Sequence, residues 1–146
     1  LTARENLRFY ARMYGVSDAD ERIEEVSAIL GSTSYLDERV RTLSNGMQKR
    51  VGLARAVLHR PRILIFDEPE AGLDQEGLEL VDGLLEAHRT EGGSAVVTTH
   101  NVERGLSIAD RVIILTNGRI SYDKEAGLLE ATSFRETYRE RTGVQL

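Results

Sequence analysis

An apolar strand that ends in two acids constrains this chain more than any other feature. Residues 63–66 read Ile-Leu-Ile-Phe, and Asp67, Glu68 and Pro69 follow directly. Such a short, continuous apolar run predicts a β-strand that is buried on both faces of a sheet. Open α/β sheets bind ligands at the carboxyl ends of their strands, where both acids would lie. One acid could bind a metal while the other activates a water, which suits nucleoside-triphosphate hydrolysis.

Length and composition narrow the classes of protein that this chain can represent. The 146 residues suffice for one domain with its own core, and the net charge of −5 argues against sequence-independent nucleic-acid binding. The absence of cysteine excludes disulfides and thiolate metal sites. No apolar run approaches the length of about 18–20 residues that a membrane span needs. The chain opens on Leu1 rather than Met, and we interpret it as a fragment.

The first 60 residues predict helices only. Apolar residues recur at helical spacing, and glycines or capping residues bound each run, which predicts helices over 3–14, 18–30 and 44–59. Ser17 with Asp20 is similar to a capping box for the second helix, and Ser44 should cap the third. Residues 32–42 form the expected connector. We therefore expect a helical subdomain over residues 1–60.

Residues 61–146 predict alternating strands and helices. Apolar runs predict strands over 63–66, 95–98 and 112–115, separated by helices over 75–89 and 102–107. Asn101 can cap the second of these helices. This alternation predicts a parallel sheet with right-handed crossovers. Asn117-Gly118 is a strong signal for a type I′ turn, which leads to a final strand over 119–122 and a helical tail. The expected fold is therefore α/β, with a mainly parallel sheet and a C-terminal β-hairpin.

Three further segments fit a phosphate site, although each also has a purely structural interpretation. The helix that begins after Ser44 presents unpaired amides and a positive dipole end, and Gly46 would let a ligand approach the backbone. Alone, a Ser cap with a nearby glycine is about as often structural. The Ala71–Asp74 loop could simply cap a helix. His100, which follows a strand, could donate to a phosphate, but a lone histidine is more often structural.

The order of these segments resembles the C-terminal part of an ABC-transporter nucleotide-binding domain, a P-loop NTPase-like fold. The matching segments are the signature loop at Leu43–Met47, Walker B at Ile63–Glu68, the D-loop at Ala71–Asp74 and the switch histidine at His100. Residues 61–146 would then be the C-terminal part of the RecA-like ATPase core. The stretch from Leu1 to Gly15 and the Gly46–Arg50 wording look most like haem-exporter or drug-exporter ATPases.

The chain also departs from this family pattern. Asn45 and Met47 replace the usual glycine and glutamine of the signature, although Gly46 remains. Asn tolerates a left-handed backbone better than other non-glycine residues. The sequence holds neither the Gly-rich Walker A loop with its Lys and Ser/Thr nor the glutamine loop. Because the phosphate cradle is missing, we expect this polypeptide alone not to hydrolyse ATP.

The resemblance assigns roles to individual residues. Asp67 would hold Mg²⁺, Glu68 would act as general base, and His100 would contact the γ-phosphate of ATP. Residues of the signature would contact ATP bound to a second nucleotide-binding subunit in a head-to-tail dimer; they are Ser44, Asn45, Gly46 and Met47. Asp74 would lie at that dimer interface. A membrane-spanning subunit would be the other partner, which implies a peripheral location on the cytoplasmic face of the membrane.

Three other interpretations compete with a transporter ATPase. Chromosome-maintenance and DNA-repair ATPases carry the same C-terminal motifs, but a long coiled coil precedes them, and here two short helices interrupted by glycine do so. A non-catalytic half-domain would act as a binding module, yet it would have no reason to keep Asp67, Glu68 and His100. Finally, the acids could form a plain charged turn, which would make four ordered motifs a coincidence.

Overall fold

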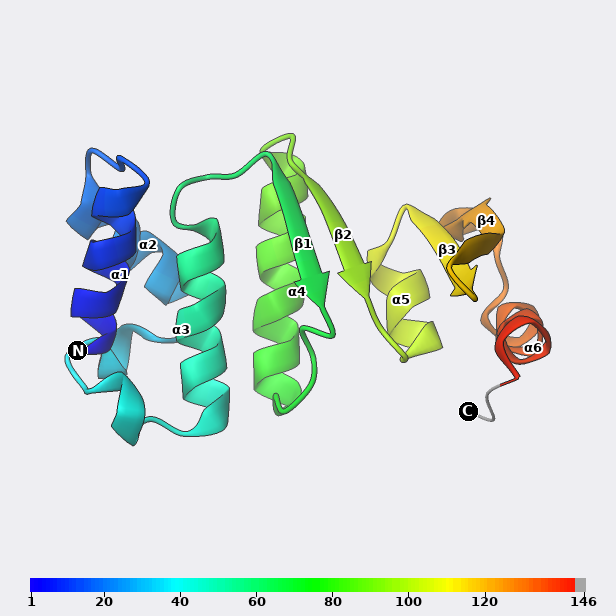
Figure 1. The fold of residues 1–146 in the computed structure, drawn as a ribbon, viewed down its shortest axis with the longest axis horizontal. Helices are drawn as coiled ribbons and strands as arrows, with labels where there is room; N and C mark the ends of the chain where they lie inside the picture. The colour runs from blue at the N-terminus through cyan, green and yellow to red at the C-terminus, as the bar shows by residue number, and fades with distance from the viewer. Residues whose placement is uncertain (144–146) are drawn as a thin grey trace. The chain divides into compact units, whose positions relative to one another are not determined.

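The computed structural model describes residues 1–143, which form two compact units, Leu1–Thr98 and residues 99–143. The α-helices of the first unit are α1 (Ala3–Met13), α2 (Ala19–Ile29), α3 (Asn45–Val57) and α4 (Gln75–Thr90). Its strands are β1 (Ile63–Asp67) and β2 (Ser94–Thr98), and short 3₁₀ helices at Thr33–Tyr35 and Val40–Thr42 lie in the connector (Figure 1). The helical region expected over residues 1–60 is confirmed as a run of helices. Its boundary as a subdomain at residue 60 remains a prediction.

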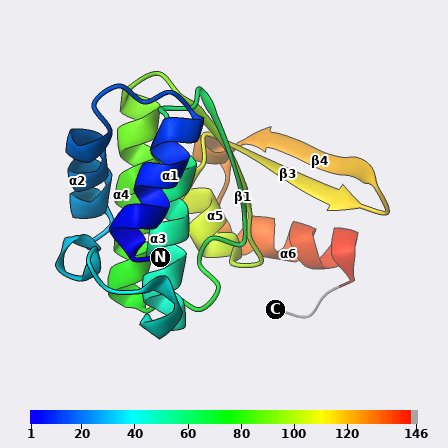
Figure 2. The same ribbon diagram turned by 60° about the vertical axis from the view of Figure 1, so that its left-hand side comes forward.

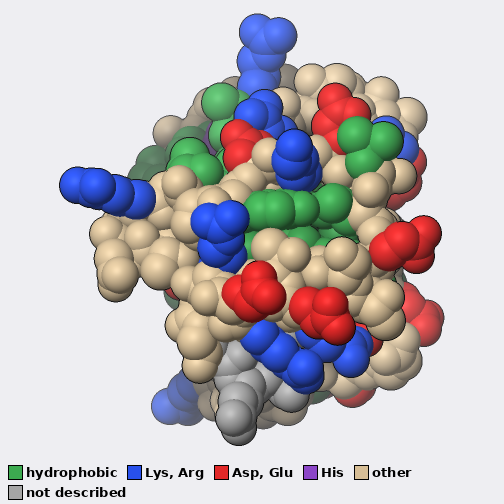
Figure 3. Space-filling view, turned by 90° about the vertical axis from the view of Figure 1, so that its right-hand side faces the viewer, with side chains coloured by type: hydrophobic (Ala, Val, Ile, Leu, Met, Phe, Trp, Pro, Cys, Tyr) green, Lys and Arg blue, Asp and Glu red, His purple; other side chains and the backbone are tan. Residues whose placement is uncertain are grey.

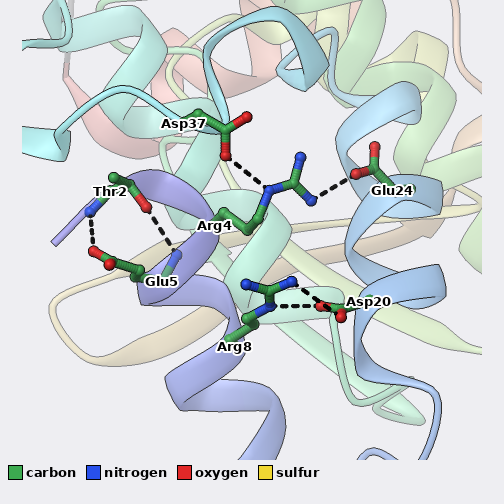
Figure 4. A network of polar contacts seen from close by, with 7 residues as sticks. All are labelled: Thr2, Arg4, Glu5, Arg8, Asp20, Glu24 and Asp37. Carbon is green, nitrogen blue, oxygen red and sulfur yellow. Dashed lines mark hydrogen bonds and ion pairs between the residues drawn. The ribbon is translucent and has the colours of Figure 1, made fainter.

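A capping box and a set of ion pairs fix the start of α1. The Thr2 hydroxyl accepts from the Glu5 amide at 3.1 Å, and the Glu5 carboxylate accepts from the Thr2 amide at 2.8 Å. Arg4 binds Glu24 of α2 and Asp37 of the connector, at 2.6 and 2.9 Å (Figure 4). These contacts hold α1 against both segments. The inner face of α1 is buried through Ala3, Leu7 and Ala11.

The capping box expected at Ser17 is wrong. Helix α2 begins one residue later, with Asp18 as its N-cap and no side-chain capping bond. The Ser17 hydroxyl lies 3.4 Å from the Asp18 carboxylate instead of reaching a helix amide. The apolar pattern of α2 was nevertheless correct, since Ile23 and Val26 are fully buried.

Helix α3 forms where Ser44 predicted it. The Ser44 hydroxyl accepts from the Met47 amide at 3.2 Å, which satisfies one of the unpaired amides of the first turn. The inner face of α3 contributes to the main core of the first unit through Val51, Leu53, Ala54 and Val57. This core also contains Leu64 and Phe66 of β1 and Val81 and Leu84 of α4. Helix α3, which begins with the signature residues, and strand β1, which ends in the acids, therefore share one core.

Strand β1 is buried on one face only, which corrects the prediction of a strand buried on both. It pairs in parallel with β2, with Asp67 opposite Thr98, and among the described residues these two strands form the whole sheet. Leu64 and Phe66 are 3% and 7% exposed, whereas Ile63 and Ile65 are 64% and 76% exposed. The core of this unit covers one face of the pair, and no described segment of the unit covers the other.

The second unit contains α5 (Val102–Ile108), β3 (Arg111–Thr116), β4 (Arg119–Glu125), a 3₁₀ turn at Ala126–Leu128 and α6 (Ala131–Thr142). Strands β3 and β4 form an antiparallel hairpin (Figure 2). Its turn residues Asn117 and Gly118 have φ of 50° and 74°, as a type I′ turn requires. The third expected strand therefore pairs in a hairpin rather than joining the parallel sheet, and β4 extends three residues beyond Tyr122.

A small core holds the second unit together. Val102, Ile114 and Phe134 are buried, and the Tyr122 ring packs at an angle of 47° against the Phe134 ring, with centroids 5.5 Å apart. The hairpin also leaves apolar side chains exposed, namely Ile113, Leu115 and Ile120. In the space-filling view of Figure 3, apolar side chains form a band among charged ones. Within residues 1–143, no helix has the length and apolarity that crossing a membrane requires.

Candidate functional site

The two acids, Asp67 and Glu68, lie at the carboxyl end of β1, where both form hydrogen bonds with Thr98 of β2. The Thr98 hydroxyl donates to the Asp67 carboxylate at 2.5 Å. The Glu68 amide in turn donates to the Thr98 hydroxyl and carbonyl oxygens, at 3.1 and 3.2 Å. Sequence reasoning missed Thr98, although its position at the end of the next parallel strand could have pointed to it.

Glu68 has a backbone conformation that L-residues rarely adopt. Its φ is 44°, in the left-handed region. The turn that follows is closed by a hydrogen bond from the Ala71 amide to the Glu68 carbonyl oxygen, at 3.1 Å. Because strained backbone of this kind clusters at active sites, the conformation supports a functional role for this residue. It also fixes the direction in which the Glu68 side chain leaves the strand.

A lysine on α3 binds the same turn from the other side. Lys49 Nζ donates to the carbonyl oxygens of Glu68 and Ala71, at 3.1 and 2.8 Å. No sequence signal marked Lys49, because a lysine in the second turn of a helix is usually solvated. The contact joins the helix that carries the signature loop to the loop that carries the acid.

The signature residues form the N-terminal turn of α3. Ser44 is the cap, Asn45 is exposed, and Met47 is half-buried against the main core. Asn45 is the first helical residue, so its tolerance of a left-handed backbone is not used. A Cβ added at Gly46 would lie 3.8 Å from the Gly72 carbonyl oxygen, an ordinary contact distance. The signature turn and the D-loop are therefore close neighbours.

Asp74 is the N-cap of α4 and is tied to α3. Its carboxylate accepts from the Gly77 amide at 2.9 Å and from the Arg50 guanidinium at 3.2 Å. The Gly77 hydrogen bond, assisted by the charge of Arg50, holds the pKa of Asp74 below its usual value. A Cβ at Gly77 would come within 3.0 Å of the same carboxylate oxygen, so this cap depends on the glycine. Lys49 and Arg50 thus contact the two ends of the loop between β1 and α4.

His100 belongs to the second unit, which is described by itself. It is exposed and precedes Asn101, which caps α5 as expected by accepting from the Arg104 amide at 3.0 Å. The structure therefore brings Asp67, Glu68, Asp74 and the signature turn together within the first unit. The role expected for His100 remains a prediction.

The acids do not form a complete protein-only metal site. Among residues 1–143, no three histidine or acidic side chains cluster closely enough to hold a metal ion. Asp67 instead offers one exposed carboxylate, with the Thr98 hydroxyl beside it. Mg²⁺ at nucleotide sites is usually held by one or two carboxylates together with substrate phosphates and waters, and this donor set fits that pattern.

Comparison with known proteins shows which proteins this chain is similar to. A family model described as ABC transporter matches residues 1–71. An uncharacterized ABC transporter ATP-binding protein, YdbJ of Bacillus subtilis, is 42% identical over 121 residues, which cover 82% of this chain and 39% of YdbJ. The aliphatic sulfonates import ATP-binding protein SsuB of Rhodopseudomonas palustris is 42% identical over 110 residues, covering 75% of this chain and 39% of SsuB.

A solved structure agrees with these sequence matches. A chain described as the ATP binding subunit of an ABC transporter superposes with a TM-score of 0.80 at 26% identity. The match covers 97% of this chain and 57% of the solved one, so this chain spans well under two thirds of each of these proteins. Over most of its length the chain is therefore similar, in sequence and in structure, to part of ABC transporter ATP-binding proteins.

Proposed function

We propose that this chain carries the signature and acid elements of an ATP-hydrolysing subunit of an ABC transporter. The observation that supports this most strongly is the junction of three segments within the first unit. The acids at the end of β1, the signature turn of α3 and the Asp74 cap of α4 are joined through Thr98, Lys49 and Arg50. In the proposal, a complete protein unites these residues with a phosphate-binding segment that the chain itself lacks.

Each acid has a separate task in this proposal. Asp67, oriented by the Thr98 hydroxyl, would hold Mg²⁺, which when bound neutralises charge on the phosphates. Glu68, on its rigid turn, would accept a proton from the attacking water. His100 would donate a hydrogen bond to the γ-phosphate.

The uncovered face of the parallel strands supports a requirement for further polypeptide. Ile63, Ile65 and Val96 are 64%, 76% and 58% exposed on neighbouring strands. Parallel sheets in α/β proteins are normally covered on both faces. In the complete protein, we expect the segment that brings the phosphate cradle to cover these residues as well.

Two partners complete the proposal. The amides at the N-terminus of α3 suit an anionic phosphate, and Ser44, Asn45, Gly46 and Met47 would bind the ATP of a second subunit in a head-to-tail dimer. Asp74 would lie at that interface. A membrane-spanning subunit would bind the helical region before Ser44, which would make the complex peripheral on the cytoplasmic face of the membrane.

The residues of the signature region favour export as the direction of transport. Gly46-Met47-Gln48-Lys49-Arg50 is similar to the signature of export-type ATPases. SsuB, whose name states import, is also similar to this chain, so direction is the finer part of the proposal. The alternative function, a non-catalytic binding module, is favoured only by the missing phosphate cradle.

Steady-state hydrolysis of Mg-ATP distinguishes an ATP-hydrolysing subunit from a non-catalytic binding module. We expect the complete protein to release phosphate with a rate that rises with the square of protein concentration at low concentration, because closure of a dimer is required. The chain of 146 residues alone should release none. A complete protein that binds ATP but shows no magnesium-dependent hydrolysis, with or without its membrane partner, would favour the binding module.

A further inference from the structure

The backbone of Glu68 is held on both sides, by β2 at its amide and by α3 at its carbonyl oxygen. On one side its N–H donates to Thr98, at the end of β2. On the other side its carbonyl oxygen accepts from Lys49 Nζ of α3. We propose that Lys49 is a positioning residue that fixes the Glu68 turn and so aims the Glu68 carboxylate. This inference rests on the proposed role of Glu68 as general base.

The geometry of the lysine suits a clamp. Its ammonium group bridges two carbonyl oxygens three residues apart in the chain, those of Glu68 and Ala71, at 3.1 and 2.8 Å. Hydrogen bonds from a charged donor are stronger than those between neutral groups. The side chain is half-buried, so its contacts with the loop compete less with water than those of a fully exposed lysine. Lys49 therefore closes the turn from outside, in parallel with the turn's own hydrogen bond.

The backbone of Glu68 explains why a clamp is needed. A φ of 44° is disfavoured for glutamate and persists only when surrounding contacts hold it. Thr98 fixes the amide, but without Lys49 the Glu68 carbonyl oxygen would keep only the 3.1 Å hydrogen bond from the Ala71 amide. Because the Cα–Cβ direction follows from the orientation of both flanking peptide groups, loss of the clamp would let the carboxylate leave its reactive position.

The clamp also makes the turn sensitive to the signature helix. Lys49 lies one turn after Gly46, and its neighbour Arg50 binds Asp74 at the far end of the same loop. The loop from Glu68 to Asp74 is thus held at both ends by consecutive residues of α3. A ligand that orders the N-terminal turn of α3 would order this loop through Lys49.

The test replaces Lys49 in the complete protein and measures both turnover and local order. Lys49→Met keeps the apolar stem but removes all donors, Lys49→Arg keeps a charged donor, and Lys124→Met makes the same exchange at an exposed position of the hairpin. We expect Lys49→Met to lower kcat at least tenfold with KM for ATP within twofold. It should also raise deuterium uptake of the Ala71 and Leu73 amides without lowering the melting temperature. Lys49→Arg should restore at least half of both quantities, and Lys124→Met should change neither.

The outcomes separate this inference from the proposed function. Unchanged kcat and deuterium uptake in Lys49→Met would overturn the clamp, as would a loss of activity that merely follows a lower melting temperature and that Lys49→Arg does not rescue. If the parent protein hydrolyses no ATP, the proposed function fails. The deuterium uptake of the Glu68–Asp74 loop then decides whether Lys49 holds the turn.

Discussion

The guanidinium of Arg22 caps the C-terminus of the signature helix by donating to the carbonyl oxygen of Val57 at 2.9 Å. A second bond, to the Leu58 carbonyl oxygen, measures 3.2 Å, and Arg22 is only 9% exposed. The last carbonyl groups of a helix lack partners within it, and a cation there also complements the helix dipole. Arg22 of α2 thus holds one end of α3, while Lys49 and Arg50 bind the Glu68–Asp74 loop near the other end.

Replacing Arg22 by methionine should destabilise the first unit. The substitution leaves two buried carbonyl oxygens without their charged donor, which we expect to cost about 2–4 kcal/mol in the free energy of unfolding. Urea denaturation of this chain measures the loss. Arg22 and Arg60 both form an ion pair with Glu25, at 2.8 and 3.3 Å, but the Arg60 side chain is 66% exposed. Arg60→Met is therefore the matched control and should cost less than about 1 kcal/mol. Equal costs for the two variants would show that Arg22 does not cap α3.

The cap formed by Asp74 should make stability depend on pH in a defined direction. The pKa of Asp74 lies below its usual value because the Gly77 amide and then Arg50 stabilise the carboxylate. A depressed pKa in the folded state contributes stability that is fully present above the unfolded pKa of about 3.9 and is lost as the pH falls through the folded value. Asp74→Asn still caps the helix but does not titrate.

Denaturation of wild type and Asp74→Asn across pH therefore isolates this contribution. The difference in unfolding free energy in favour of wild type should be constant from pH 7 to pH 5. It should then shrink as the pH falls below about 4, where the unfolded carboxyl begins to bind protons. A difference that grows toward acid pH would contradict the assignment.

The uncovered face of β1 leads to a prediction that compares two proteins. In this chain Ile65 is 76% exposed, so Ile65→Thr should change the free energy of unfolding by less than about 0.5 kcal/mol. In the complete protein the same change should cost more than about 1 kcal/mol, because we expect the face to be covered there. Leu64→Ala, at a buried neighbour, should cost about 2–5 kcal/mol in both. A small effect of Ile65→Thr in both proteins would contradict this prediction, because it would show that this face of β1 is uncovered in the complete protein too.

Glu68→Gln should separate nucleotide binding from turnover in the complete protein. Glutamine keeps the shape of the side chain but cannot accept the proton of the attacking water, so we expect hydrolysis to fall about 10²–10⁴-fold while ATP stays bound. Phosphate release and retained radiolabelled ATP measure the two effects. The control is Glu21→Gln, the same exchange at an exposed position of α2, which should leave turnover within about threefold. Full activity in Glu68→Gln would remove Glu68 as the base.

Local signals in the sequence predicted most elements of the fold. The Ser44 cap, the Asn117-Gly118 turn and the Asn101 cap are each made by neighbours within a few residues, and all three form as expected. The Ser17 cap failed although its spacing was right. Two adjacent residues could begin that helix, and the chain uses Asp18.

Features that depend on distant segments could not be predicted in the same way. An apolar run cannot reveal whether one or both faces of a strand are covered, because that depends on which other segments pack there. Likewise, the acids could be located from their position after β1, but Lys49 and Thr98 contact them only through tertiary packing. The strained backbone of Glu68 is a property of that packing too.

Calorimetric titration of Mg-ATP tests the central claim most directly: that these residues supply the acids and signature of an ATPase but not its phosphate cradle. We predict no measurable heat of binding for the 146-residue chain and micromolar affinity for a complete protein that carries the phosphate-binding segment. Micromolar affinity for the chain alone would contradict the account, because its residues would then form a nucleotide site without that segment.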